Sequence, residues 1–194
     1  VGGVLEEIVK KAQEARGMSE RTQRIEKIKE IVRFFAHENL AIRQGIMQVL
    51  EGFGEEGREA LLASLQGNES DAVKRAVILS LGYLAKNEKE SVKNEIAGKL
   101  KPLTDDSDVE KRKAAYTALR YIGTDAAKKT LREVIRKKEK ILSEALERAD
   151  KNIPGKEEFT TIALELALTR DPNFVDDLLS FIPLLSRAYH DPKA

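Results

Sequence analysis

Cysteine and tryptophan are both absent from this chain of 194 residues. Without cysteine the chain can form no disulfide, no thiolate zinc site and no cysteine nucleophile. Its two histidines, His37 and His190, are too few for a multi-histidine metal centre, and no HExxH motif is present. We therefore expect no metal and no other cofactor. The lack of cysteine suits a reducing compartment, and we expect a cytoplasmic protein.

Long apolar runs and an excess charge of one sign are also missing. No apolar run approaches 18 residues, so no membrane helix is expected. Lys+Arg 34 nearly balances Asp+Glu 33, and with a net charge of +1 any nucleic-acid site must be a local basic patch. There is no GxxxxGK[ST] or GxGxxG loop, and no nucleophile stands beside a base. We expect that the protein is not an enzyme.

The residues that are present predict an all-α protein. Apolar residues recur at three- and four-residue spacing, and strict alternation is absent. We expect helices over residues 4–15, 19–37, 39–52, 55–66 and 71–85. Two further helix starts are predicted at 87–90 and 107–110, where a polar cap precedes a glutamate by three residues. Proline at position 102 should end the helix between them.

Three segments repeat one pattern. They read AIRQGIMQVLEGFG over 41–54, AVKRAVILSLGYLA over 72–85 and EKRKAAYTALRYIG over 110–123. Each has a cation in third position, a small residue two later and a leucine in tenth position: Arg43, Lys74 and Arg112; Gly45, Ala76 and Ala114; Leu50, Leu81 and Leu119. Such spacing predicts stacked units that cannot bury their apolar faces alone. The leucines should form a core running through all the units.

The same residues resemble a known family. Val73-Lys74, Ala76 and Leu81-Gly82, and again Arg112 to Ile122-Gly123, match the second helix of HEAT repeats, particularly the short bacterial and archaeal kind. Lys111 departs from the pattern, because an aliphatic residue is expected there. The resemblance implies an α-α superhelix, that is, a HEAT-like solenoid of antiparallel helix hairpins.

The chain is expected to have three parts. Residues 1–18 form an N-terminal helix that opens without methionine and is expected to be trimmed, residues 19–153 form the HEAT-like repeat array with a weaker fourth unit from 124, and residues 154–194 form a C-terminal helical cap or interface segment. The apolar residues of the last part are Phe174, Leu178, Phe181, Ile182 and Leu185. They either cap the array, which is favoured, or form a homodimer or partner interface.

The resemblance implies a non-enzymatic protein-protein interaction scaffold or adaptor that holds a partner helix or peptide on its concave face. The residues expected there are Arg75, Tyr83, Lys113, Arg120 and Tyr121. Tyrosine and arginine are favoured interface anchors. Equally, the two tyrosines could pack their rings into the stack and expose only the hydroxyl groups.

The cations in third position have two interpretations. Arg43, Lys74 and Arg112 either line a binding face or form a ladder between repeats with Asp71 and Asp108, as the HEAT-like resemblance implies. The ladder is favoured.

A basic stripe is predicted on the helix from residue 124. Lys129, Arg132, Arg136 and Lys140 fall within about 80° of one another at the helical period, opposite Ala127, Leu131 and Ile135. The stripe is either a solvated outer face or a site for nucleic-acid phosphates. An enzyme of the HEAT-like lyase or hydroxylase kind is a third possibility, but the chain has one His-Glu pair, His37-Glu38, where such hydroxylases use several.

Overall fold

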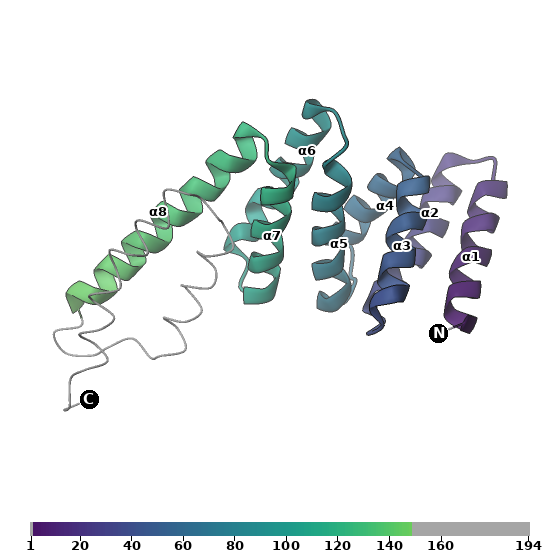
Figure 1. The fold of residues 1–194 in the computed structure, drawn as a ribbon, viewed down its shortest axis with the longest axis horizontal. Coiled ribbons are helices and arrows are strands. Elements are labelled where there is room, and N and C mark those ends of the chain that lie inside the picture. Colours follow the sequence, from purple (N-terminus) through teal and green to yellow (C-terminus); the bar gives the residue numbers. More distant parts are fainter. Residues whose placement is uncertain (1, 149–194) are drawn as a thin grey trace.

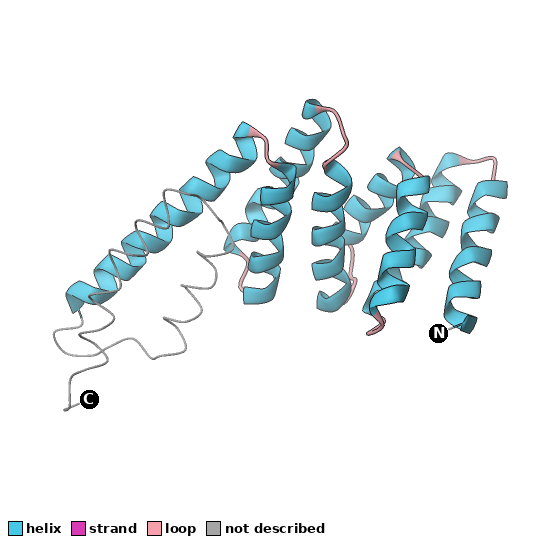
Figure 2. Ribbon diagram, viewed as in Figure 1, coloured by secondary structure: helices cyan, strands magenta, loops and turns pink. Residues whose placement is uncertain are grey.

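The computed structural model describes residues 2–148, which form eight α-helices and two 3-10 helices and contain no strand (Figure 2). The helices are α1 (Gly2–Gly17), α2 (Arg21–Val32), η1 (Arg33–Ala36), α3 (Leu40–Gly52), α4 (Glu55–Gln66), α5 (Asp71–Ala85), α6 (Glu90–Leu100), η2 (Lys101–Asp105), α7 (Val109–Ile122) and α8 (Asp125–Arg148). The expected C-terminal segment 154–194, with Phe174 to Leu185 and His190, lies outside the described residues.

The helices stand in two rows (Figure 1). The odd row contains α1, α3, α5 and α7, and the even row contains α2, α4, α6 and α8. Within the odd row α1 packs on α3 and α5 packs on α7; within the even row α2 packs on α4 and α6 packs on α8. Helix α5 also contacts α4 and η1, which joins the two halves of the stack. The all-α solenoid of helix hairpins predicted from the sequence is therefore confirmed.

A single core runs through the stack. Leu50, Leu81 and Leu119 occupy equivalent positions on α3, α5 and α7, and all three are fully buried. They belong to one apolar cluster that extends from Ile8 on α1 to Val134 on α8. Burial of each such side chain contributes about 1.5–3 kcal/mol. Because the cluster is continuous from one unit to the next, each helix pair depends on its neighbours for most of its apolar contacts.

Helices α5 and α7 approach each other closely. A Cβ atom added to Gly82 on α5 would lie 2.5 Å from the Cα atom of Ala118 on α7. Such a distance is below any van der Waals contact, so only glycine fits there without a shift of one helix. The small residues of the repeated pattern, Gly45, Ala76 and Ala114, are the other positions at which a close approach of two helices is expected. A Cβ atom added to Gly45 would lie 3.3 Å from the Cδ2 atom of Leu5, so the helices are closer at Gly82 than at Gly45. Gly57 on α4 is equally confined, because an added Cβ atom would overlap the carbonyl oxygen of Leu50 on α3.

Several helix starts follow the predicted capping chemistry. The Oδ1 atom of Asn39 accepts a hydrogen bond from the backbone N–H of Ala41 at 2.8 Å, which caps α3. The Oγ atom of Ser70 accepts from the N–H of Val73 and caps α5. At the other end of α7, Gly123 takes the left-handed conformation with φ of 66°, which lets the chain leave the helix toward α8.

Three helices of the repeat array begin one to three residues later than the sequence predicts. The expected helix over 19–37 begins at Arg21 and changes to a 3-10 turn at Arg33, and Ser19 does not cap it. Helix α6 was predicted to begin with a polar cap within residues 87–90. It begins after Lys89, whose side chain makes no capping hydrogen bond. At 107–110 the cap is Asp108, one residue later than predicted. There the side chain of Asp106 accepts from the N–H of Asp108, which keeps Asp108 outside the helix as its cap.

The Gly82 contact predicts opposite effects for two glycine-to-alanine substitutions. Gly82→Ala should lower the free energy of unfolding by about 1–3 kcal/mol, because the new methyl group meets the α7 backbone. Gly98→Ala on α6 should raise the free energy of unfolding by about 0.5–1 kcal/mol. A Cβ atom added there would meet no neighbouring atom within 4 Å, and alanine is the better helix former. Urea unfolding followed by circular dichroism measures both. A Gly82→Ala protein as stable as the unsubstituted chain would contradict the close approach.

Candidate protein-binding surface

The arginines of the predicted cation column bind the loops in front of their own helices. The guanidinium group of Arg43 donates to the carbonyl oxygens of His37 and Glu38 at 3.0 and 3.1 Å. Arg112 donates in the same way to the carbonyls six and five residues before it, at 2.8 and 3.1 Å. These two arginines therefore fix their own loops and do not pair with Asp71 or Asp108. The predicted ladder is therefore wrong for these two arginines, whereas the charge of Lys74 does act on Asp71 and contributes to lowering its pKa.

Arg24 on α2 repeats this arrangement at a position that the sequence pattern did not include. It donates to the carbonyls of Met18 and Ser19, both at 2.8 Å, which again lie six and five residues before it. Its remaining guanidinium nitrogens donate to Glu56 on α4. One arginine therefore closes a loop and joins two neighbouring even-row helices at the same time.

Asp71 and Asp108 do connect neighbouring repeats, but with other cations. The Nζ atom of Lys111 lies 2.6 Å from an oxygen of Asp71, and Arg75 lies 3.6 Å from an oxygen of Asp108. Both pairs join α5 to the start of α7. Lys111 is the residue that departs from the aliphatic family pattern, at the place where Ile42 and Val73 are buried in the other units. At this position Lys111 therefore replaces a buried aliphatic side chain and supplies the cation of an ion pair between repeats.

The Asp71–Lys111 ion pair shifts the pKa of both side chains. The hydrogen bond from Lys111 lowers the pKa of Asp71, and the same bond raises the pKa of Lys111. A lowered carboxylate pKa stabilises the fold above the ordinary pKa of aspartate, and this contribution is lost as the pH falls through the lowered value. A raised lysine pKa stabilises the fold below the ordinary lysine value and is lost in alkali. The pair therefore contributes across the neutral range.

Three large side chains form an exposed patch on the odd row. Tyr83 and Leu79 on α5 are 55% and 40% exposed, and Tyr121 on α7 is 46% exposed. Tyr83 and Tyr121 occupy equivalent positions of the repeated pattern, so they lie on the same face of two adjoining helices. We call Leu79, Tyr83 and Tyr121 the tyrosine patch. Both predicted tyrosines face outward and are not packed into the stack.

The other residues predicted for this face are more constrained. Arg75 is engaged with Asp108, and Lys113 pairs with Glu110 one helical turn earlier at 2.9 Å. The guanidinium carbon of Arg120 lies 5.5 Å from the centre of the Tyr121 ring. Arg75 therefore joins two repeats, Lys113 is paired within α7, and Arg120 borders the patch.

Leu79 was not singled out from the sequence, although the repeats contain a signal for it. Its equivalents are Gln48 on α3, which is exposed, and Thr117 on α7, which is half-buried. A polar residue at two of three equivalent positions indicates an outward face. A leucine among them is therefore an exposed apolar residue and marks a local surface patch.

Other possible sites in the described part of the chain show structural roles. The Nδ1 atom of His37 accepts a hydrogen bond from the backbone N–H of Asn39 at 3.0 Å, so this histidine shapes a turn. Within residues 2–148 no group of three or more His, Cys, Asp or Glu side chains is placed to hold a metal ion. Over the same residues, no helix has both the length and the apolar character needed to cross a bilayer.

The Asp71–Lys111 pair predicts a measurable change in titration. In Lys111→Met the pKa of Asp71 should rise toward its ordinary value, because the hydrogen bond that holds the carboxylate ionised is lost. Carboxyl 13C chemical shifts followed against pH measure this. Lys113→Met is the matched control, since Lys113 pairs with Glu110 and should leave Asp71 unchanged. If Asp71 titrated identically in both variants, the assignment of its partner would be wrong.

Comparison with known proteins agrees with this geometry. Residues 58–149 match the family model described as HEAT repeats, a range that contains nearly all of α4 and the whole of α5 to α8. No curated protein and no solved structure matches the chain. The matched residues include the Gly82 contact, the ion pairs between α5 and α7, and the tyrosine patch. Residues 58–149 of this chain are HEAT-like repeats.

Proposed function

We propose that this protein is a non-enzymatic scaffold that binds a partner protein on the odd-row face of α5 and α7. HEAT repeats are commonly protein-interaction scaffolds. The observation that carries the proposal is the tyrosine patch, where Leu79, Tyr83 and Tyr121 are 40–55% exposed on adjoining helices. Each has an apolar body, and the two tyrosines add a hydroxyl group that can bind a partner.

The chemistry of the patch suits a protein partner. Tyrosine supplies a large contact area with few rotatable bonds and a polar end, and it is enriched among residues that dominate binding energy. The patch also rests on a rigid base, because Gly82 and Ala118 hold α5 against α7 and two ion pairs join the same helices. Little ordering is then needed on the scaffold side, which favours affinity.

The extent of the patch suggests the form of the partner. On α3 the positions equivalent to Leu79 and Tyr83 are Gln48 and Gly52, so the apolar surface does not continue there. A short amphipathic helix or an extended peptide covers a surface of two helices. We infer that such a segment lies across α5 and α7, with its apolar side chains against the tyrosine patch.

The proposal predicts that Tyr83→Ala with Tyr121→Ala weakens partner binding and preserves the fold. Two truncated anchors should raise the dissociation constant by about 30-fold or more, since each anchor contributes about 1 kcal/mol or more. Both side chains are exposed, so stability should change by only about 0.5 kcal/mol for each. The partner is first identified by a photo-crosslinker at position 79, and its affinity is then measured by calorimetry.

A matched control removes exposed apolar side chains from other parts of the odd row. Val9→Ala with Leu40→Ala alters residues that are 50% and 60% exposed on α1 and α3. This control should bind the crosslinked partner with unchanged affinity. Equal affinity for the tyrosine double variant and the unsubstituted chain would refute the proposed surface.

A further inference from the structure

The outward face of α8 is a second surface, formed on the even row by the basic stripe. Lys129, Arg132, Arg136 and Lys140 are all exposed, whereas Ala127, Leu131 and Ile135 on the other side of the helix are buried. At a rise of 1.5 Å for each residue, the four cations extend along about 16 Å of the helix axis. The stripe predicted from the sequence therefore exists as a straight row of cations.

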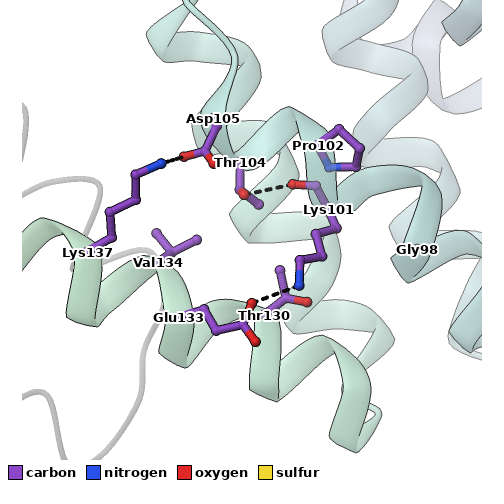
Figure 3. A pocket seen from close by; sticks show the side chains of 9 residues that line it. All are labelled: Gly98, Lys101, Pro102, Thr104, Asp105, Thr130, Glu133, Val134 and Lys137. Atoms are coloured by element: carbon purple, nitrogen blue, oxygen red, sulfur yellow. Dashed lines mark hydrogen bonds and ion pairs between the residues drawn. The ribbon is translucent and has the colours of Figure 1, made fainter.

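Two ion pairs fix which side of α8 faces outward. A hollow of about 430 Å³ lies between η2 and α8, and residues of both helices line it (Figure 3). Lys101 reaches Glu133 at 2.8 Å and Lys137 reaches Asp105 at 2.7 Å, so each pair joins η2 to α8. Because both lysines of this hollow are held by carboxylates, the hollow itself is a poor anion site. The two ion pairs that line the hollow anchor α8, the helix that carries the stripe.

The first three cations of the stripe are not neutralised by described neighbours. Among the residues that the structure describes, Lys129, Arg132 and Arg136 take part in no ion pair. Glu133 on the same helix also feels the charges of Lys129 and Arg136, but its strongest interaction is the hydrogen bond from Lys101. Its carboxylate is therefore directed toward η2, and a row of positive charge is left on the outside of α8.

The composition of this face distinguishes between classes of partner. From Lys128 to Lys140, every exposed side chain that the structure describes is charged. A protein interface with substantial affinity needs a buried apolar centre, which this face does not offer. Sequence-tolerant binding of single strands needs aromatic side chains on which bases stack, and these are also absent from the face. A narrow row of cations fits a linear polyanion better than a broad surface such as a membrane.

We propose that the basic stripe of α8 binds the phosphate backbone of double-stranded nucleic acid without reading its sequence. Four cations along about 16 Å match a duplex, which carries one negative charge for roughly every 1.7 Å of its axis. The contact uses only the outer face of α8 and leaves the tyrosine patch on the odd row accessible. The two proposals therefore succeed or fail separately.

The test measures binding of the full chain to a fluorescein-labelled duplex of 20 random base pairs by anisotropy. Four neutralised phosphates predict that log K falls with log salt at a slope of about −3.6, or roughly a hundredfold between 50 and 200 mM. The variant Lys129→Gln, Arg132→Gln, Arg136→Gln, Lys140→Gln should lose this binding. A duplex of the same length and different sequence should bind equally.

The matched control removes four exposed lysines from other helices and from the loop before α6. Lys10→Gln, Lys86→Gln, Lys89→Gln, Lys99→Gln gives the same net charge as the stripe variant, so it separates the stripe from overall attraction. The control should keep most of the affinity and nearly the full salt slope. Equal loss in the two variants, a flat salt response, or no binding at 50 mM salt would overturn the proposal.

Two further ligands test the class of polyanion. Vesicles containing phosphatidylserine, and a peptide of glutamate residues with the same charge as the duplex, should bind more weakly than the duplex at equal salt. Stronger binding of either would assign the stripe to a membrane or to an acidic protein and would reject the nucleic-acid proposal.

A substitution that strengthens binding provides an independent check. Glu133→Gln removes the acid beside Lys129 and Arg136, so we expect about two- to fivefold tighter duplex binding. Glu6→Gln on α1, at the opposite end of the stack (Figure 1), should leave the affinity unchanged. Weaker binding by Glu133→Gln at unchanged stability would count against electrostatic contact at the stripe.

Discussion

The approach of the α5 and α7 backbones at Gly82 and Ala118 is the constraint on which the described structure depends most. It sets the distance between two adjoining odd-row helices, and with it the fit of Leu81 and Leu119 in the shared core. At this distance the side chains at the start of α7 reach α5, so that Lys111 meets Asp71. The same spacing brings the outward faces of α5 and α7 together into one surface. A residue larger than glycine at position 82 would disturb the fit of the core leucines, the contact between Lys111 and Asp71, and the joint surface of the two helices.

The fold could be predicted from the sequence because its signals are periodic. Leucines at equal places in three segments indicated the buried column. The bounds of α4 and α5 were predicted correctly, since apolar spacing agrees there with the residues at the helix ends, namely the glycines around α4 and Ser70 before α5. The start of α7 was misplaced by one residue, because Ser107 and Asp108 can both cap a helix. Only the bond from Asp108 to Asp106 decides between them.

The contacts of the cations could not be predicted in the same way. A column of basic residues indicates that each side chain lies at an equivalent place, but it does not indicate what that side chain reaches. Arg43 and Arg112 turn back to carbonyl groups of a loop whose path no pattern describes. Lys111 was an exception to the pattern, and its partner Asp71 is 40 residues away in the chain. The outward face of α8 was easier to predict, because helical period places it, whereas the sequence left both orientations of Tyr83 and Tyr121 open.

The loop contacts of Arg24, Arg43 and Arg112 have a consequence for how such an array can change in evolution. Each arginine donates to carbonyl groups of the turn immediately before its own helix. The starts of α3, α5 and α7 are separated by 31 and 38 residues, and the longer unit contains the extra turn η2. Because these turns are closed by the helix that follows them, a unit that begins with one can be duplicated, deleted or lengthened at its connecting segment without rebuilding the units around it. The gene can therefore alter the length of the stack and the identity of each exposed surface independently.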